Sequence, residues 1–189
     1  MNTKTTKQDL LDTLYAPYKD SHILLVQGGS NRIIFGEGNI DATLMLIGEA
    51  PGATEDELMR PFVGKSGRLL NQALEAAGTT REQTFITNIV KVRPPDNRKP
   101  LPKELESGRE LLLKQIDIIK PKVICTLGAS ALEGLLGHPV AITQLRGKLI
   151  PFLDGFLMPT FHPAYILRDA KKLPILVHDI SAAVAAAEQ

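Results

Sequence analysis

Carboxylates gather in residues 48–67, GEAPGATEDELMRPFVGKSG, directly after the apolar run of residues 42–47. Glu49, Glu55 and Asp56 are among them, and together with a histidine they could bind a divalent cation and serve a hydrolase. The glycines of the stretch permit backbone angles that other residues avoid, and Pro51 fixes one dihedral angle. Because ligands of open α/β sheets bind where strands end, this loop is the first candidate site.

A second candidate is His162, which stands between Pro159 and Pro163 in the segment MPTFHPAYILR. A lone histidine is more often structural than catalytic. The two prolines, however, would hold this side chain stiffly in a loop that follows a predicted strand, where sites usually form. The other three histidines have no comparable setting.

Asn88 interrupts the apolar run FITNIV. Such an amide either satisfies the backbone of a neighbouring loop or faces a ligand at the end of its strand. The loop that follows, KVRPPDNRKP, carries four basic residues between prolines. It is either an ordinary solvated loop or a stiff surface for phosphates.

Hydrophobic periodicity predicts the elements that must position these residues. We expect strands at residues 42–47, 84–90 and 123–127, and two strands within 149–158. Helices are expected at residues 6–15, where Pro17 would end the helix, and at 66–77, 103–119, 129–136 and 173–187. Two short apolar runs, residues 23–26 and 33–35, indicate a hairpin or an irregular connection.

The 189 residues, 43% of them hydrophobic, suit one α/β domain with a full core. We expect a single domain over residues 1–189, built as a three-layer α/β/α sandwich with a short, mainly parallel central sheet. A net charge of +1 excludes a protein that holds nucleic acid by bulk electrostatics alone. The polar start and the lack of a membrane-length apolar run lead us to expect a cytoplasmic protein without membrane contact.

The motifs GEAPGxxED with PFVGKSG, ITNIVKVRPPDNRKP, LRGK and TFHPAYILR, in this order, resemble those of the family 4 uracil-DNA glycosylases. The resemblance runs from about residue 34 to residue 168, so residues 1–32 are expected to be a variable helical extension. It implies a monomeric DNA-repair enzyme that flips uracil out of DNA and hydrolyses its glycosidic bond, leaving an abasic site.

The resemblance also implies roles for single residues. Phe62 matches the position on which the base stacks, Asn88 matches the amide that reads uracil, and Gly48 is expected among the uracil-binding residues. His162 would stabilise the departing uracil anion, and Glu49 would orient water or the neighbouring loop. Residues beside these loops would contact DNA: Lys65, Ser66, Arg68, Lys91, Arg93, Arg98, Arg146, Lys148, Leu167 and Arg168.

Family 4 members typically hold an iron-sulfur cluster on four cysteines, but the only cysteine here is Cys125, inside an apolar run. The third and fourth ligand positions match Val92 and Gly108. Four-thiolate ligation is therefore impossible, and we expect neither a cluster nor another metal site. Support for the loop of residues 94–102 would then come from packing alone.

Two other classes of function remain open. One is a non-catalytic relative that binds DNA or a damaged base, since fold does not guarantee activity. The other is an unrelated small-molecule or metal hydrolase that uses Glu49, Glu55, Asp56 and His162, although their spacing forms no recognised ligand pattern.

Overall fold

The computed structural model describes residues 5–19 and 26–189, and a mixed sheet lies at the centre of these ranges. Its strands are β1 (Glu37–Gly38), β2 (Leu44–Gly48), β3 (Phe85–Asn88), β4 (Val123–Leu127), β5 (Ile150–Phe152) and β6 (Gly155–Thr160). Their order across the sheet is β1-β3-β2-β4-β6-β5. The inner pairs are parallel, whereas the edge strands β1 and β5 are antiparallel to their neighbours. The expected mainly parallel sheet is confirmed.

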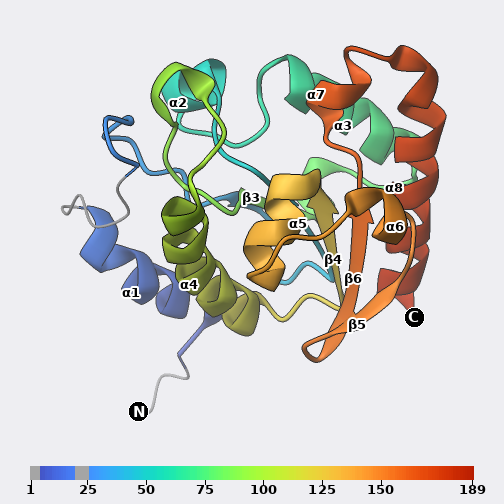
Figure 1. The fold of residues 1–189 in the computed structure, drawn as a ribbon. Coiled ribbons are helices and arrows are strands. Elements are labelled where there is room, and N and C mark those ends of the chain that lie inside the picture. The colour runs from blue at the N-terminus through green and yellow to red at the C-terminus, as the bar shows by residue number, and fades with distance from the viewer. Residues whose placement is uncertain (1–4, 20–25) are drawn as a thin grey trace.

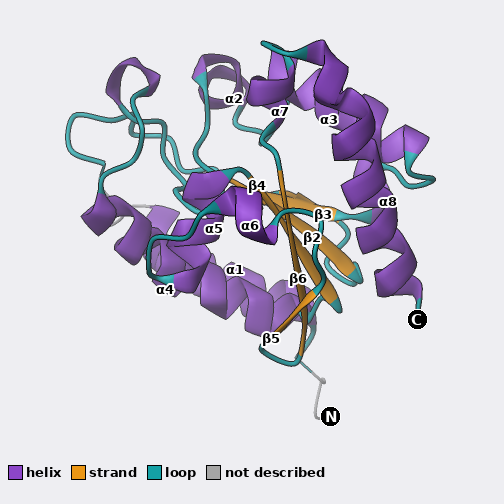
Figure 2. Ribbon diagram, turned by 45° about the vertical axis from the view of Figure 1, so that its right-hand side comes forward, coloured by secondary structure: helices purple, strands orange, loops and turns teal. Residues whose placement is uncertain are grey.

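Helices cover both faces of this sheet, as Figure 2 shows. The longer ones are α1 (Lys7–Lys19), α3 (Lys65–Ala76), α4 (Pro102–Ile119), α5 (Ala129–Leu136) and α8 (Leu173–Glu188). Helices α1, α4 and α5 lie on one face, and α3 and α8 lie on the other (Figure 1). Three shorter helices follow strands or loops: α2 (Ala53–Leu58), α6 (Ile142–Leu145) and α7 (Pro163–Ile166). The expected three layers are confirmed.

Successive side chains of β2 belong to two separate hydrophobic clusters, one on each face of the sheet. Met45 and Ile47 pack with Leu112 of α4 on one face of the sheet, while Leu46 packs with Leu70 of α3 on the other. Successive side chains of a strand point to opposite faces, so a run that is apolar throughout belongs to a strand covered on both sides. This is why the apolar runs of residues 42–47 and 123–127 could be identified as core strands.

Two local expectations are corrected, the ends of helix α1 and of strand β3. Helix α1 continues through Pro17 to Lys19 instead of ending before the proline. Strand β3 ends at Asn88 rather than at residue 90, because its partner β2 ends opposite, at Gly48. Residues 33–35 form an irregular segment, which is the second of the two alternatives for this part of the chain. Of the apolar run 23–26, residues 23–25 lie outside the described residues.

The first helix belongs to the same core as the sheet, although it falls in the segment expected to be a variable extension. Leu11 of α1 is buried with Leu112 and Ile116 of α4. In the two described ranges, no helix has the length and apolarity needed to cross a membrane.

Candidate active site

A cavity of about 530 Å³ opens at the end of the sheet where β2 and β3 terminate. Helices α2 and α7 and the start of α3 lie above this end, at the top of Figure 1. The cavity brings together most of the residues that the sequence singled out. Its lining includes Glu49, Glu55, Phe62, Asn88 and His162.

Gly48, the last residue of β2, allows an aromatic ring and an amide to approach each other. A Cβ at this position would lie 2.4 Å from Cζ of Phe62 and 2.5 Å from Oδ1 of Asn88. Both distances are far shorter than van der Waals contact, so only glycine fits here. The ring of Phe62 and the amide of Asn88 therefore meet at one corner of the cavity.

Phe62 adopts a left-handed backbone conformation, with φ 51°. This conformation is costly for an aromatic residue and persists only when the surroundings enforce it. Arg81 supplies part of that enforcement, because its guanidinium donates to the main-chain oxygens of Pro61 and Phe62, each over 2.7 Å. A Cβ at Gly67 would lie 1.8 Å from the Phe62 oxygen, so the start of α3 also presses on this peptide.

Asn88 is 1% exposed, and its Oδ1 has no hydrogen-bond partner among the described residues. A buried acceptor without a partner costs about 1 to 3 kcal/mol. Buried polar atoms of this kind call for an explanation, and an absent ligand is one. Of the two alternatives for Asn88, this geometry favours the one in which the amide faces a ligand.

His162 is the residue before α7, and its Nδ1 accepts a hydrogen bond from the N–H of Ala164 at 3.0 Å. The proton of the neutral imidazole must therefore be on Nε2. Burial lowers the pKa of His162 to about 4, although the nearby carboxylate of Glu55 favours the charged form. The ring centroid of His162 lies 5.7 Å from that of Phe62. His162 is thus an uncharged N–H donor beside the aromatic ring.

The two glutamates of the cavity differ in what they contact. Oε1 of Glu55 accepts hydrogen bonds from the N–H groups of Val63 and Gly64, at 2.9 and 2.7 Å, and so holds the loop after Phe62. The carboxylate of Glu49 has no such partner among the described residues, and Glu49 lines the cavity. Among the same residues no group of three histidine, cysteine or acidic side chains could hold a metal ion. The geometry therefore does not favour a metal hydrolase.

The predicted DNA contacts differ in whether they line the cavity. Lys65, Ser66, Arg98 and Arg168 line the cavity, whereas Arg93, Arg146 and Leu167 do not. Leu167 is nevertheless 48% exposed and adjoins Arg168. The guanidinium of Arg146 donates to both carboxylate oxygens of Asp179, at 2.8 and 2.9 Å, and lies over the ring of Phe161. Asp179 is 1% exposed, so Arg146 is engaged with the core.

The expectation that Lys91 contacts phosphate is wrong. Lys91 is 1% exposed, and its Nζ donates to Oγ1 of Thr87 at 2.6 Å and to the main-chain oxygen of Asn88 at 2.7 Å. Burial lowers the pKa of its amine well below the ordinary value. The side chain turns back along β3 into the core, where no phosphate can reach it.

Two residues that shape the site were not predicted from the sequence. Gly128, directly after β4, has φ +93°, and a Cβ there would lie 2.9 Å from Cβ of His162. A glycine at the end of a predicted strand is a signal that could have indicated this close approach. Arg81, which holds Phe62, gave no signal, because it lies in a separate helical turn whose position depends on the tertiary fold.

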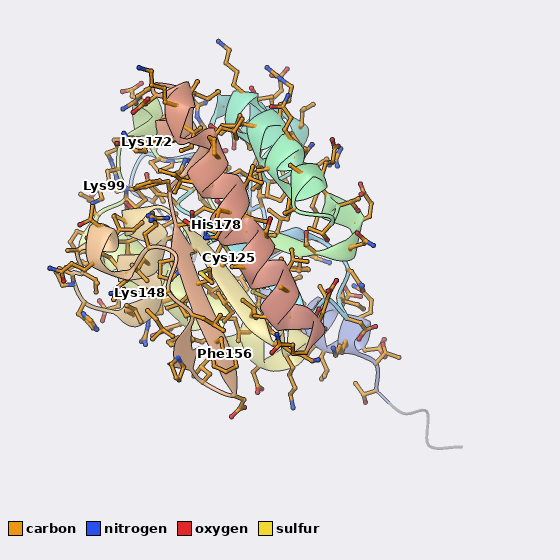
Figure 3. All side chains as sticks on the ribbon, turned by 90° about the vertical axis from the view of Figure 1, so that its right-hand side faces the viewer. Lys99, Cys125, Lys148, Phe156, Lys172 and His178 are labelled. Carbon is orange, nitrogen blue, oxygen red and sulfur yellow. The ribbon has the colours of Figure 1, made fainter. Side chains whose placement is uncertain are left out.

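The residues at the cluster positions do not fit an iron-sulfur cluster. Val92 is buried in the core, and a Cβ at Gly108 of α4 would lie 2.2 Å from the main-chain oxygen of Ile89. Cys125 is buried on β4 beneath α8 (Figure 3), and burial raises the pKa of its thiol. Gly108 is thus explained by close packing between α4 and the end of β3.

The loop of residues 94–102 is held by charge as well as by packing, contrary to expectation. Arg98 donates to both oxygens of the Glu104 carboxylate, at 2.8 and 2.7 Å, and the N–H of Leu101 donates to the same carboxylate at 2.7 Å. Arg93 donates to Oδ1 of Asn97 at 2.8 Å. This polar framework supports the side of the cavity that Pro94, Asn97 and Arg98 line.

Comparison with known proteins agrees with the resemblance seen in the motifs. The family model described as uracil DNA glycosylase superfamily matches residues 35–183. A type-4 uracil-DNA glycosylase of Thermotoga maritima is 42% identical over 166 residues, 87% of this chain and 86% of that protein. Another, of Pyrobaculum aerophilum, is 45% identical over 70% of this chain and 72% of that protein. The match of the family model over most of the length and the similarity to these relatives lead to one assignment: the chain belongs to the uracil-DNA glycosylase superfamily.

Proposed function

We propose that this protein is a monofunctional uracil-DNA glycosylase of DNA repair, which extrudes uracil from DNA and hydrolyses its N-glycosidic bond. The observation that carries the proposal is the unpartnered Oδ1 of Asn88, buried beside the ring of Phe62. Uracil offers the N–H that this oxygen lacks, together with an adjacent carbonyl for the Asn88 amide nitrogen. Cytosine offers the opposite pattern and would leave buried groups unpaired, at a cost of about 1 to 3 kcal/mol each.

Bond cleavage leaves negative charge on the uracil and positive charge on the sugar. The Nε2 proton of His162 is available to a uracil carbonyl oxygen, where a donor stabilises the anion. Because this imidazole is uncharged, the donor keeps its own proton while the bond breaks. The oxygen of a water molecule then joins C1′ of the sugar, and one of its protons passes to the departing uracil. Glu49, whose carboxylate is free for water, is our candidate for orienting it.

Several basic and polar groups at the mouth of the cavity form the proposed DNA contact. Lys65, Ser66 and Arg168 line the cavity, and Arg98 does so while paired with Glu104. We assign Arg93 to the same surface, and Leu167 to the gap that the extruded base leaves, because it is exposed beside Arg168. We propose uracil-containing DNA as the partner and a monomer as the active form.

We also propose that this glycosylase works without an iron-sulfur cluster. The chain has one cysteine, which is buried, and the position of the fourth ligand is occupied by a glycine that leaves no room for a side chain. The Arg98–Glu104 pair supports the loop of residues 94–102 instead.

A nicking assay tests the proposed activity. Labelled single- and double-stranded oligonucleotides with one uracil are incubated with the protein and a chelator, and are then treated with alkali. We expect strand cleavage at the uracil, which Asn88→Ala and His162→Ala abolish. Asn39→Ala is the matched control, because Asn39 is exposed and does not line the cavity. Folded protein that binds DNA without cleaving it would contradict the proposal and favour a non-catalytic relative.

A further inference from the structure

The buried amine of Lys91 contacts the backbone of the residue that reads the base. Its Nζ donates to the main-chain oxygen of Asn88 and to the hydroxyl of Thr87. The N–H at the other end of the same peptide group, that of Ile89, donates to the main-chain oxygen of Gly48 at 2.9 Å. Both polar atoms of the peptide after Asn88 are therefore fixed by hydrogen bonds.

The Asn88 side chain depends on this peptide for its direction. Its Oδ1 has no partner of its own among the described residues, so no side-chain hydrogen bond to that oxygen aims the amide. Rotation of the following peptide would alter the ψ angle of Asn88 and move the chain that carries the amide. A methionine or leucine would fill the space of Lys91 without burying an amine, which is costly in an apolar core. A hydrogen-bonding role explains why a lysine stands here.

The network continues from Thr87 to the first helix. The Thr87 hydroxyl donates to the main-chain oxygen of Phe35 at 2.8 Å. Gln115 of α4 donates to the same oxygen at 2.7 Å and to the hydroxyl of Tyr15 at 2.6 Å. The rings of Tyr15 and Phe35 stack, with 4.0 Å between centroids. Lys91 is thus anchored through Thr87 to α1 and α4 and cannot shift independently of the core.

We propose that Lys91 is a positioning residue for uracil recognition: it fixes the peptide after Asn88 and so aims the Asn88 amide into the cavity. This inference rests on the proposed glycosylase function, because it concerns how that site selects its base. It also gives the segment that follows β3 a polar anchor in the interior.

The test compares Lys91→Met, which removes the amine but keeps the length of the side chain, with two variants of its partner. Thr87→Val removes the hydroxyl, and Thr87→Ser retains it. Tyr15→Phe is the control at the far end of the network, because it keeps the ring stack. For each variant, kcat/KM on uracil DNA is measured. Fluorescence anisotropy then compares binding to uncleavable oligonucleotides that carry 2′-fluoro-deoxyuridine or 2′-fluoro-deoxycytidine.

We expect Lys91→Met to lower kcat/KM by roughly 10- to 100-fold, as a misplaced binding group does, and to remove the preference for uracil over cytosine. Thr87→Val lowers kcat/KM and the preference for uracil to a smaller extent. Thr87→Ser, which retains the hydroxyl, keeps both at the level of the wild type. Tyr15→Phe lowers the melting temperature but keeps the preference. A merely structural role would lower the melting temperature of Lys91→Met without changing the preference.

A folded Lys91→Met protein with kcat/KM and preference within about twofold of the wild type would overturn the inference. Where Lys91→Met does not fold, an unchanged preference in Thr87→Val overturns it instead. Failure of the proposed function is seen separately, in the wild type. A wild type without activity that still prefers uracil refutes glycosylase function alone, and the binding comparison then decides on Lys91. A wild type with neither activity nor a preference for uracil refutes both the glycosylase function and the role of Lys91.

Discussion

The imidazole of His162 accepts a hydrogen bond from the main-chain N–H of Ala164 through Nδ1, over 3.0 Å. This single contact fixes the tautomer and directs the N–H donor at Nε2 away from the backbone of α7. With the pKa lowered to about 4 by burial, His162 stays uncharged at neutral pH. The charge state of the donor therefore does not change over the pH range in which an ordinary histidine titrates.

A pH profile of activity follows from this. We expect kcat/KM on uracil DNA to show no step near pH 6.5, where an ordinary imidazole loses its charge. The measurement is a series of single-turnover and steady-state rates at several pH values with the wild type and His162→Gln. A step near pH 6.5 in the wild type that His162→Gln removes would show that His162 works as a charged donor.

Stability should also depend on the pH through His162. Its pKa in the folded state lies below the ordinary value, so the unfolded state binds more protons between pH 6.5 and pH 4. The free energy of unfolding is therefore expected to fall, by at most about 3 kcal/mol, as the pH decreases through this range. Urea unfolding of the wild type and His162→Gln at several pH values measures the difference. His178→Gln is the control, because His178 lies exposed on the outer face of α8 (Figure 3).

Gly48→Ala should abolish activity with little loss of secondary structure. The new methyl group would displace the Phe62 ring or the Asn88 amide, both of which lie within 2.5 Å of it. Since misplacement of about 1 Å can cost 100-fold in rate, we expect kcat/KM to fall by at least that factor. Gly78→Ala provides the contrast: φ is +81° there and the space is open, so it should cost about 1 kcal/mol of stability and leave activity intact. Similar activity in both variants would contradict this view of Gly48.

Removing Arg146 should reduce the stability of the fold, whereas removing Arg168 should weaken DNA binding. Arg146→Ala would leave the Asp179 carboxylate buried with one remaining hydrogen bond, from Thr160, and should lower the free energy of unfolding by about 3 kcal/mol. Arg168→Ala should leave stability unchanged and reduce the slope of log K against log salt by about 1. Urea unfolding and anisotropy at several salt concentrations separate the two effects. If Arg146→Ala also reduced the slope of log K against log salt, Arg146 would contact DNA after all.

Iron analysis tests the proposed absence of the cluster. Protein purified without oxygen should be colourless, should contain iron far below one atom per chain, and should keep its activity after dialysis against a chelator. Its ultraviolet and visible spectrum should lack charge-transfer bands between thiolate and iron. A brown protein with stoichiometric iron would refute the proposal.

Much of the fold could be predicted because its strong signals are local. The strand Val123–Leu127 and the helix Ala129–Leu136 match their predicted bounds, since the strand is an unbroken apolar run and both elements are rich in apolar residues. Helix α4 begins within one residue of its predicted start. The short helices α2 and α7 were missed, because four to six residues are too few to show a periodicity.

The sequence indicated which residues line the cavity, but it did not indicate most of the contacts that hold them. Phe62, Asn88 and His162 meet in one cavity, as the motifs predicted. The left-handed conformation of Phe62 depends on Arg81 and Gly67, which contact it only in the folded chain. Lys91 was wrongly predicted to be exposed, because a lysine next to a polar, proline-rich loop is usually solvated. Only the fold shows that Thr87 and Asn88 accept its hydrogen bonds.

The close packing at Gly108 restricts which side chains this position can hold. A cysteine at position 108 would need a Cβ where the carbonyl oxygen of Ile89 lies 2.2 Å away, so α4 would first have to move off the end of β3. That movement would disturb the chain next to Asn88 before any thiolate could contribute. Gly108 therefore limits any substitution that would place a thiol at this position of α4.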